Sequence, residues 1–298
     1  MRNIKKQIPA AAAVLVALII CAVAYFNGEN DNKGAADVSG FHNGLIVHFI
    51  DVGQGDSEFI ELPGGQCMLI DAGTQDYAQT VIDTITECGY SSIDYVVATH
   101  PHADHIGGMS GVIENFDIEN FYMPQVTATT DCFEDLLDAL TEKDLKINKP
   151  EAGEEIYSDS LAVIEFLAPV GDNYNNLNDY SAVVKITYGE NSFLFTGDAE
   201  KVSEDEMLER EFDSLSADVL KVGHHGSDTA TSDDFLNAVD PEYAVISCGT
   251  GNSYGHPHSE TLENLTAAGA EVYRTDELGT VTIYCDGNNG FNMDFEDN

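Results

Sequence analysis

Six consecutive residues, His100-Pro101-His102-Ala103-Asp104-His105, bring four side chains that can bind a metal ion into one short segment. Imidazole nitrogen and carboxylate oxygen are ligands that suit zinc and neighbouring divalent ions. His100 and His102 can converge on one ion, whereas the adjacent Asp104 and His105 can turn toward a second. The cluster therefore predicts a two-metal site, which the fold must hold on a rigid scaffold. The alternative is a solvated, His-rich turn.

Short apolar segments lead into this cluster and into two further sets of ligand-type side chains. Residues 93–99 are rich in β-branched and aromatic residues, which is typical of a buried strand, and they end at His100. Residues 192–196 lead into Asp198, and residues 218–223 lead into His224-His225. Three strand ends therefore deliver candidate metal ligands, and we expect Asp198 to bridge two cations.

These motifs resemble the metallo-β-lactamase superfamily of binuclear hydrolases. The similarity lies in HxHxDH at 100–105, Thr-Gly-Asp at 196–198 and Gly-His-His-Gly-Ser at 223–227. Three further segments are similar to the branch that contains the hydrolase domain of the ComEC/Rec2 competence proteins, namely Phe-Ile-Asp-Val-Gly-Gln-Gly-Asp-Ser at 49–57, Asn-Asp-Tyr-Ser at 178–181 and Tyr-Gly-His-Pro at 254–257. The same branch includes secreted choline-phosphate esterases that act on teichoic acids. The resemblance covers about residues 44–285.

The resemblance implies an α/β fold, an αββα four-layer sandwich, with the metals at one edge of two central mixed sheets. The hydrophobic pattern independently alternates strand-like and helical segments. We expect strands at 45–51, 57–62, 67–71, 93–99, 161–167, 182–188, 192–196, 218–223, 243–247 and 280–285. We expect helices at 77–88, 131–142, 203–212, 232–238 and 259–268.

The resemblance also implies the ligands of two divalent metal ions, zinc or manganese. The first ion would be held by His100, His102 and Asp198. The second would be held by Asp104, His105, Asp198 and either His224 or His225. Many members of the superfamily supply one more histidine to the first ion, but this chain has no histidine between residues 105 and 198. Three protein ligands and a water are typical of a catalytic site, and the missing ligand favours manganese.

Other residues are candidates for substrate contacts or for support of the ligands. In the ComEC-like branch the region of the missing histidine carries an Asn/Asp-x-x-Ser segment. This makes Asn178, Asp179 and Ser181 candidates, with an ordinary loop as the alternative. Lys221 could contact phosphate, although a surface position is the simpler interpretation.

The expected mechanism uses two adjacent cations. A water shared between them loses a proton near neutral pH, and the cations also neutralise the phosphoryl or acyl group under attack. Asp104 would orient this nucleophile as well as bind metal. His256 would contact a phosphate or protonate the leaving oxygen. Ser227 is expected to be a turn residue and not a nucleophile.

The amino terminus indicates export. A basic flank at 1–7 precedes an apolar run at 8–26, whose length lies between that of a signal-peptide core and that of a spanning helix. We favour an uncleaved anchor, which places the protein at the extracellular face of the membrane, over a cleaved signal, which would release it. Residues 27–40 predict a flexible tether, and residues 41–298 predict one hydrolase domain. No protein partner is predictable.

The charge of the chain argues against a conventional DNA-binding surface. Twelve Lys and Arg residues stand against 53 Asp and Glu, which gives a formal net charge of -41. Such a surface repels polyanions, and DNA binding generally uses Lys and Arg contacts to phosphates. A nuclease with this composition would rely on its metals.

Three classes of function are compatible with these features. We favour an exported phosphodiesterase, either a nuclease that resembles the competence hydrolase or a phosphorylcholine-type esterase of a wall polymer. The second class is a hydrolase of non-phosphate esters, and the third is a non-catalytic binding module. The third is disfavoured because all the expected ligand positions except the missing histidine are filled.

Overall fold

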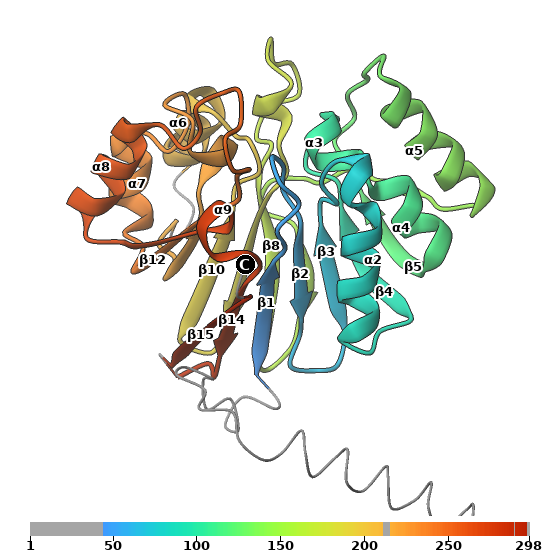
Figure 1. The fold of residues 1–298 in the computed structure, drawn as a ribbon, viewed down its shortest axis with the longest axis horizontal. Coiled ribbons are helices and arrows are strands. Elements are labelled where there is room, and N and C mark those ends of the chain that lie inside the picture. Colours follow the sequence, from blue (N-terminus) through green and yellow to red (C-terminus); the bar gives the residue numbers. More distant parts are fainter. Residues whose placement is uncertain (1–43, 211–214, 289, 297–298) are drawn as a thin grey trace, which may run out of the picture. The chain divides into compact units, whose positions relative to one another are not determined.

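Two β-sheets pack face to face at the centre of the protein (Figure 1). The computed structural model describes residues 44–210, 215–288 and 290–296, which lie in one compact unit. The first sheet has the strand order β15 (Phe291–Phe295), β14 (Val281–Cys285), β1 (Leu45–Phe49), β2 (Glu58–Glu61), β3 (Cys67–Ile70), β4 (Ser92–Val97), β5 (Asp117–Tyr122) and β6 (Ile147–Asn148). The second has the order β13 (Glu271–Arg274), β12 (Tyr243–Ile246), β11 (Val219–Lys221), β10 (Asn191–Phe195), β9 (Val183–Tyr188), β8 (Ala162–Ala168) and β7 (Glu155–Ser158).

The inner faces of the two sheets form the main hydrophobic core. In β1 every second side chain is buried, because successive residues of a strand point to opposite faces. Phe49 of the first sheet contacts Phe195 of the second, with ring centroids 6.0 Å apart. Both rings are fully or almost fully buried. This aromatic contact packs the two sheets against each other.

Helices cover both outer faces, one group on each side in Figure 1. The first sheet packs against α2 (Ala78–Glu87), α3 (Ala103–Ile106), α4 (Met109–Asn115) and α5 (Asp131–Glu142). The second packs against α6 (Lys201–Glu209), α7 (Asp233–Val239) and α8 (Ser259–Ala268), while α9 (Thr275–Leu278) follows β13. In α5, for example, Phe133, Leu136 and Leu140 are buried and recur at helical spacing. The predicted αββα sandwich is therefore confirmed.

All the predicted strands and helices occur, with ends that differ by a few residues. Strands β5, β6, β7, β13 and β15 were not predicted, because they are very short or carry many partly exposed side chains that break the apolar pattern. No helix was predicted directly after His102. Residues 103–106 and 109–115 instead form α3 and α4, which are short and rich in glycine at their junction.

The predicted apolar segment at 8–26 and the tether at 27–40 lie outside the described residues. In the part of the chain that the structure describes, every helix is too short or too polar to cross a membrane.

Truncation of Phe195 tests the contribution of the core between the sheets. Phe195→Ala should lower the free energy of unfolding by about 3–5 kcal/mol, because the cavity it leaves is bounded by two packed sheets. Leu161→Ala is the matched control: Leu161 is 52% exposed, so its removal should cost less than about 0.5 kcal/mol. Urea unfolding followed by circular dichroism measures both. Equal losses would contradict this packing.

Candidate metal centre

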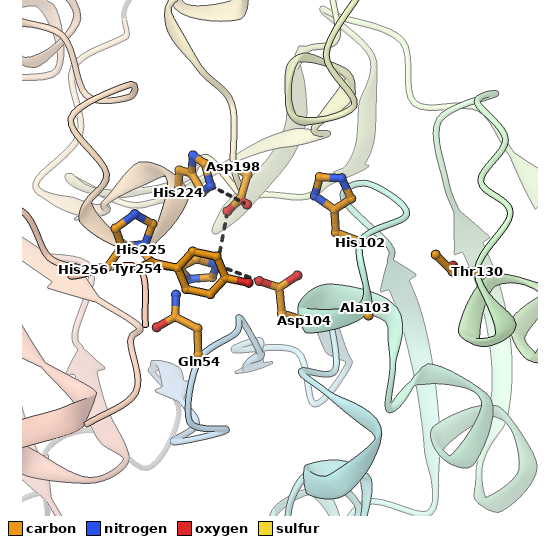
Figure 2. A pocket seen from close by; sticks show the side chains of 10 residues that line it. All are labelled: Gln54, His102, Ala103, Asp104, Thr130, Asp198, His224, His225, Tyr254 and His256. Atoms are coloured by element: carbon orange, nitrogen blue, oxygen red, sulfur yellow. Dashed lines mark ion pairs between the residues drawn. The ribbon is translucent and has the colours of Figure 1, made fainter. Parts of the chain in front are cut away.

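The ligand-type side chains meet where strands of both sheets end. His100 and His102 follow β4 of the first sheet, whereas Asp198 follows β10 of the second. His225 follows β11, which is parallel to β10 and adjacent to it. Neighbouring parallel strands end at the same edge of a sheet, so Asp198 and His225 lie close together although they are far apart in sequence. The packing of the two sheets brings His100 and His102 to them. Figure 2 shows how several of them face one pocket.

The first group of candidate ligands contains His100, His102 and Asp198, each of which offers one atom within 4.8 Å of the others. His100 Nε2 lies 3.7 Å from Asp198 Oδ2 and 2.9 Å from His102 Nδ1. Burial and the nearby charge of His105 hold the pKa of His100 well below its usual value. His100 is therefore neutral and retains the lone pair that metal binding requires.

The second group contains Asp104, His105 and His225, whose ligand atoms also lie within 4.8 Å of one another. His225 Nε2 lies 3.4 Å from Asp104 Oδ2. Asp198 faces this group as well, since its Oδ1 atom lies 3.2 Å from His105 Nε2 and 3.6 Å from His225 Nε2. Its two carboxylate oxygens are thus directed at two different groups, which is the arrangement that a bridging ligand needs.

Several buried atoms at this point have no hydrogen-bond partner. They are His105 Nε2, His225 Nε2 and Asp198 Oδ1. Buried polar atoms without partners are costly, and a cation placed among them would satisfy all three. Burial lowers the pKa of His225, but the carboxylates of Asp198 and Asp56 outweigh it and raise that pKa to about 10. The pocket therefore attracts positive charge, and the donor set fits two divalent ions.

The structure distinguishes between His224 and His225. Both residues have left-handed backbone conformations, with φ of 47° and 53°, which turn their side chains in different directions. His225 is buried, and its Nδ1 atom donates to the carbonyl oxygen of Ser247 at 2.9 Å. The His224 side chain is 24% exposed, and its Nδ1 atom pairs with Glu200 at 3.1 Å. Of the two alternatives, the geometry favours His225 as the ligand.

Two buried carboxylates, Asp71 and Asp56, contact candidate histidine ligands through the second ring nitrogen. Neither was predicted as a site residue. His105 Nδ1 donates to Asp71 Oδ2 at 2.7 Å, and His225 Nδ1 lies 3.1 Å from Asp56 Oδ1. A carboxylate on the second nitrogen of a ligating imidazole fixes the orientation of the ring. Their positions in the sequence could have indicated these two residues, because Asp71 directly follows an apolar strand and Asp56 lies in the motif at 49–57.

The segment that carries Asp56 passes directly beneath the first cluster. Asp56 N donates to the carbonyl oxygen of Asp104 at 3.1 Å. A Cβ atom at Gly55 would lie 2.4 Å from the same oxygen, so a side chain there cannot be accommodated. The glycine of this motif is therefore required by the close approach of two backbones.

Lys221 lies neither at the surface, which was the simpler expectation, nor among the residues that line the pocket. Its side chain is fully buried, and its Nζ atom lies 2.7 Å from Asp56 Oδ2. It also donates to the carbonyl oxygen of Val222 at 3.0 Å. Because a buried charge requires a partner, Lys221 supports Asp56 from below, and Asp56 in turn contacts His225.

The segment at 178–181 lies beside the first group of candidate ligands. Ser181 Oγ lies 3.3 Å from His100 Nδ1 and accepts a hydrogen bond from Asp198 N at 3.2 Å. Asn178 Nδ2 donates to Glu200 Oε1 at 3.1 Å. Asp179 instead faces the backbone of Glu200 and Ser203 at the start of α6, away from the pocket. Ser181 therefore contacts two candidate ligands, whereas Asp179 does not.

A pocket of about 360 Å³ opens over both groups. It is lined by Gln54, His102, Ala103, Asp104, Thr130, Asp198, His224, His225, Tyr254 and His256. None of these lining residues is Lys or Arg. Gln54, Thr130 and Tyr254 were not predicted as site residues. Tyr254 is 66% exposed and stacks on His256, with ring centroids 5.6 Å apart.

His256 lies in the pocket, as expected, but its protonation favours one of its two suggested roles. Burial, together with the neighbouring imidazoles of His224 and His225, lowers the pKa of His256 to about 4. The ring is therefore neutral near pH 7, which suits a hydrogen bond to the substrate better than proton donation from a cationic imidazole.

Comparison with known proteins gives a consistent result. The family model described as the metallo-beta-lactamase superfamily matches residues 50–250. ComE operon protein 3 of Bacillus subtilis (strain 168) is 31% identical over 252 residues, which cover 79% of this chain and 32% of that protein. Competence protein ComA of Neisseria gonorrhoeae is 30% identical over 242 residues, which cover 80% and 32%. The chain therefore spans about a third of the length of these curated relatives.

A solved structure shares the fold at low sequence identity. CmlA, described as a diiron beta-hydroxylase from Streptomyces venezuelae, aligns with a TM-score of 0.54 and 12% identity, covering 90% of this chain and 59% of that chain. The likeness concerns the architecture alone.

A pair of variants tests the difference between the adjacent histidines. His225→Ala should remove one of two bound ions, because it deletes a buried candidate ligand. His224→Ala should retain both, since its ring lies at the pocket wall. Metal content after dialysis, measured by inductively coupled plasma mass spectrometry, gives the ratio of ions to chain. Loss of an ion from the His224 variant alone would reverse the assignment.

Proposed function

Because the chain belongs to the metallo-β-lactamase superfamily, we propose that it is a binuclear metal-dependent hydrolase, and specifically a phosphodiesterase of the ComEC/Rec2-like branch. The observation that carries the proposal is the position of Asp198 between two groups of ligand-type side chains in one open pocket. We assign one ion, zinc or manganese, to His100, His102 and Asp198. We assign the second to Asp104, His105, Asp198 and His225. When bound, two such ions would activate water and neutralise charge on the attacked group.

The protein side chains around the pocket have distinct parts in this proposal. Burial opposes ionisation of Asp104, but its contact with His225 and the charge of His105 lower its pKa below the usual value. Asp104 is therefore ionised at neutral pH and can accept a hydrogen bond from the attacking water. His256, which is neutral, would hydrogen-bond to an oxygen of the substrate. The backing carboxylates Asp71 and Asp56 keep the two buried imidazoles in place.

Phosphodiesters are the favoured substrates because two adjacent cations can stabilise both the attacking and the leaving oxygen of a phosphoryl group. The relationship to competence proteins supports DNA as one such substrate. The pocket lining contains no Lys or Arg, and the chain has a net charge of -41. A long polyanion would therefore gain little binding energy outside the metal centre, so we expect weak affinity for DNA and dependence on the metals.

One observation favours a second candidate function, a phosphorylcholine-type esterase of a wall polymer. The exposed ring of Tyr254 lies at the pocket, and the protein is strongly acidic. A quaternary ammonium group is attracted both to the face of an aromatic ring and to negative charge. The hydrolysis of non-phosphate esters on the same scaffold remains the third candidate.

We further propose that the apolar run at 8–26 directs the chain to the extracellular side of the membrane. Its basic flank and length support either an uncleaved anchor or a cleaved signal. An uncleaved anchor would make the membrane a partner of this protein.

Asp198→Ala tests the catalytic proposal. This variant should lose both metals and hydrolysis, because removal of the cations forfeits several kcal/mol of transition-state stabilisation, or more than about a thousandfold in rate. The control is Ser227→Ala, because the Ser227 hydroxyl is engaged with Thr229 and does not line the pocket. The assay uses the full chain, stripped with chelator and reloaded with zinc or manganese, on bis-p-nitrophenyl phosphate. Equal loss of activity in both variants would refute the mechanism.

Tyr254→Ala separates the two substrate classes. If the protein is a choline-phosphate esterase, the variant should lower kcat/KM for p-nitrophenyl phosphorylcholine by about 5–30-fold, the value of one cation–π contact. Tyr254→Phe should retain the activity. The rate on bis-p-nitrophenyl phosphate should change little in either variant. Cleavage of single-stranded DNA without any preference for the choline ester would instead support the nuclease.

A further inference from the structure

A second cluster of metal-ligand side chains lies on the outer face of the first sheet. It consists of His48 on β1, Glu61 on β2 and Cys88, which directly follows α2. One donor atom from each lies within 4.8 Å of the other two. His48 Nε2 is 3.0 Å from Glu61 Oε1 and 3.6 Å from Cys88 Sγ. None of the three lines the pocket above Asp198.

The register of the sheet explains why these side chains meet. His48 is paired directly with Phe59 on β2 and with Thr282 on β14, so the three side chains share one face. Glu61 lies two residues beyond Phe59 and therefore points to that same face. The end of α2 passes above it and brings Cys88 to the pair. Three separate segments of the chain thus each supply one donor.

The environment of His48 orients its ring for binding. His48 Nδ1 lies 3.0 Å from Thr282 Oγ1, and the ring stacks on Phe59 with centroids 6.0 Å apart. With Nδ1 engaged by the hydroxyl, Nε2 is directed at Glu61 and Cys88. Engagement of one imidazole nitrogen by a polar group is the usual support for a ring whose other nitrogen binds metal.

We propose that His48, Glu61 and Cys88 form a third metal site, separate from the candidate catalytic centre, for a transition-metal ion of the zinc class. Nitrogen, oxygen and sulfur together are the donor set of borderline-soft ions such as Zn²⁺ and Co²⁺, whereas Mg²⁺ and Ca²⁺ prefer oxygen. The His48 and Glu61 side chains are 13% and 21% exposed, so an ion can enter from solvent and keep a water as its fourth ligand. The bound ion would connect the end of α2 to β1 and β2.

Without a bound metal ion, the side chain of Cys88 is protonated. Burial and the charge of Glu61 raise the pKa of Cys88 to about 12, so Cys88 is a neutral thiol near pH 7. A metal ion must displace this proton, and its affinity for the site should therefore increase with pH. The cysteines in the described part of the chain are free thiols, so Cys88 is available as a ligand.

The alternative is a simple hydrogen-bonded cluster, and cobalt distinguishes the two. The catalytic ligands that we assign include no cysteine, so a thiolate-to-cobalt charge-transfer absorption reports the third site alone. The full chain, purified in mild detergent and stripped with chelator, is titrated with Co²⁺ near pH 7.5. We expect the band to appear, to saturate at one thiolate-bound ion per chain, and to disappear when Zn²⁺ is added.

Variants assign the band to its ligands. Cys88→Ser and His48→Gln should each abolish it. Cys132→Ser is the matched control, because Cys132 is another half-buried free cysteine outside the cluster, and it should keep the band. Asp198→Ala should also keep it, which separates this site from the catalytic centre. Absence of the band in the unmodified chain, or its persistence in Cys88→Ser, would overturn the proposal. Thermal unfolding of each variant shows whether it is folded, and His48→Gln provides an independent test if Cys88→Ser is not.

Discussion

The contact between the Asp198 carboxylate and the surrounding imidazoles joins the two halves of the sandwich. Asp198 follows a strand of the second sheet, whereas His100 and His105 follow a strand of the first. All three side chains are buried at the interface. Removing a carboxylate from water costs several kcal/mol unless opposite charge compensates it. Burial raises the pKa of Asp198, but His105 and His225 outweigh this effect and keep the group ionised. The architecture thus maintains a negative charge where the two proposed cations would bind.

Behind this contact lies a layer of buried charged groups. Lys221 compensates Asp56, Asp56 orients His225, and Asp71 orients His105. Each group is buried, so none can exchange its partner for water, and removal of one would leave another unpaired. The candidate ligand His225 is therefore positioned by two successive buried side chains, Asp56 and then Lys221. Through Asp56, the buried Lys221 therefore helps to orient the imidazole of His225.

The sequence predicted the main strands and helices because their apolar residues recur with a clear period. It missed β7, β13 and β15, because partly exposed strands do not show that pattern. The candidate ligands could be predicted because the chain has few histidines and most of them are clustered. Asp71 and Tyr254 were not predicted as site residues, because one acidic or aromatic residue carries only a weak local signal and only the fold brings it to the site. The choice between His224 and His225 depends on two left-handed backbone conformations, which neither residue type indicates.

The wide spacing of the candidate ligands along the chain also determines when metal can be acquired. His100 and His102 are separated by one residue in sequence, but Asp198 and His225 follow only about a hundred residues later. The loops that separate them must close before their atoms can meet, and each closure is entropically unfavourable until the sheets pack. A partly folded chain can therefore present isolated imidazoles but not a binuclear site. Metal binding at the proposed centre would in this sense be a late event, which reports that both sheets have formed and packed together.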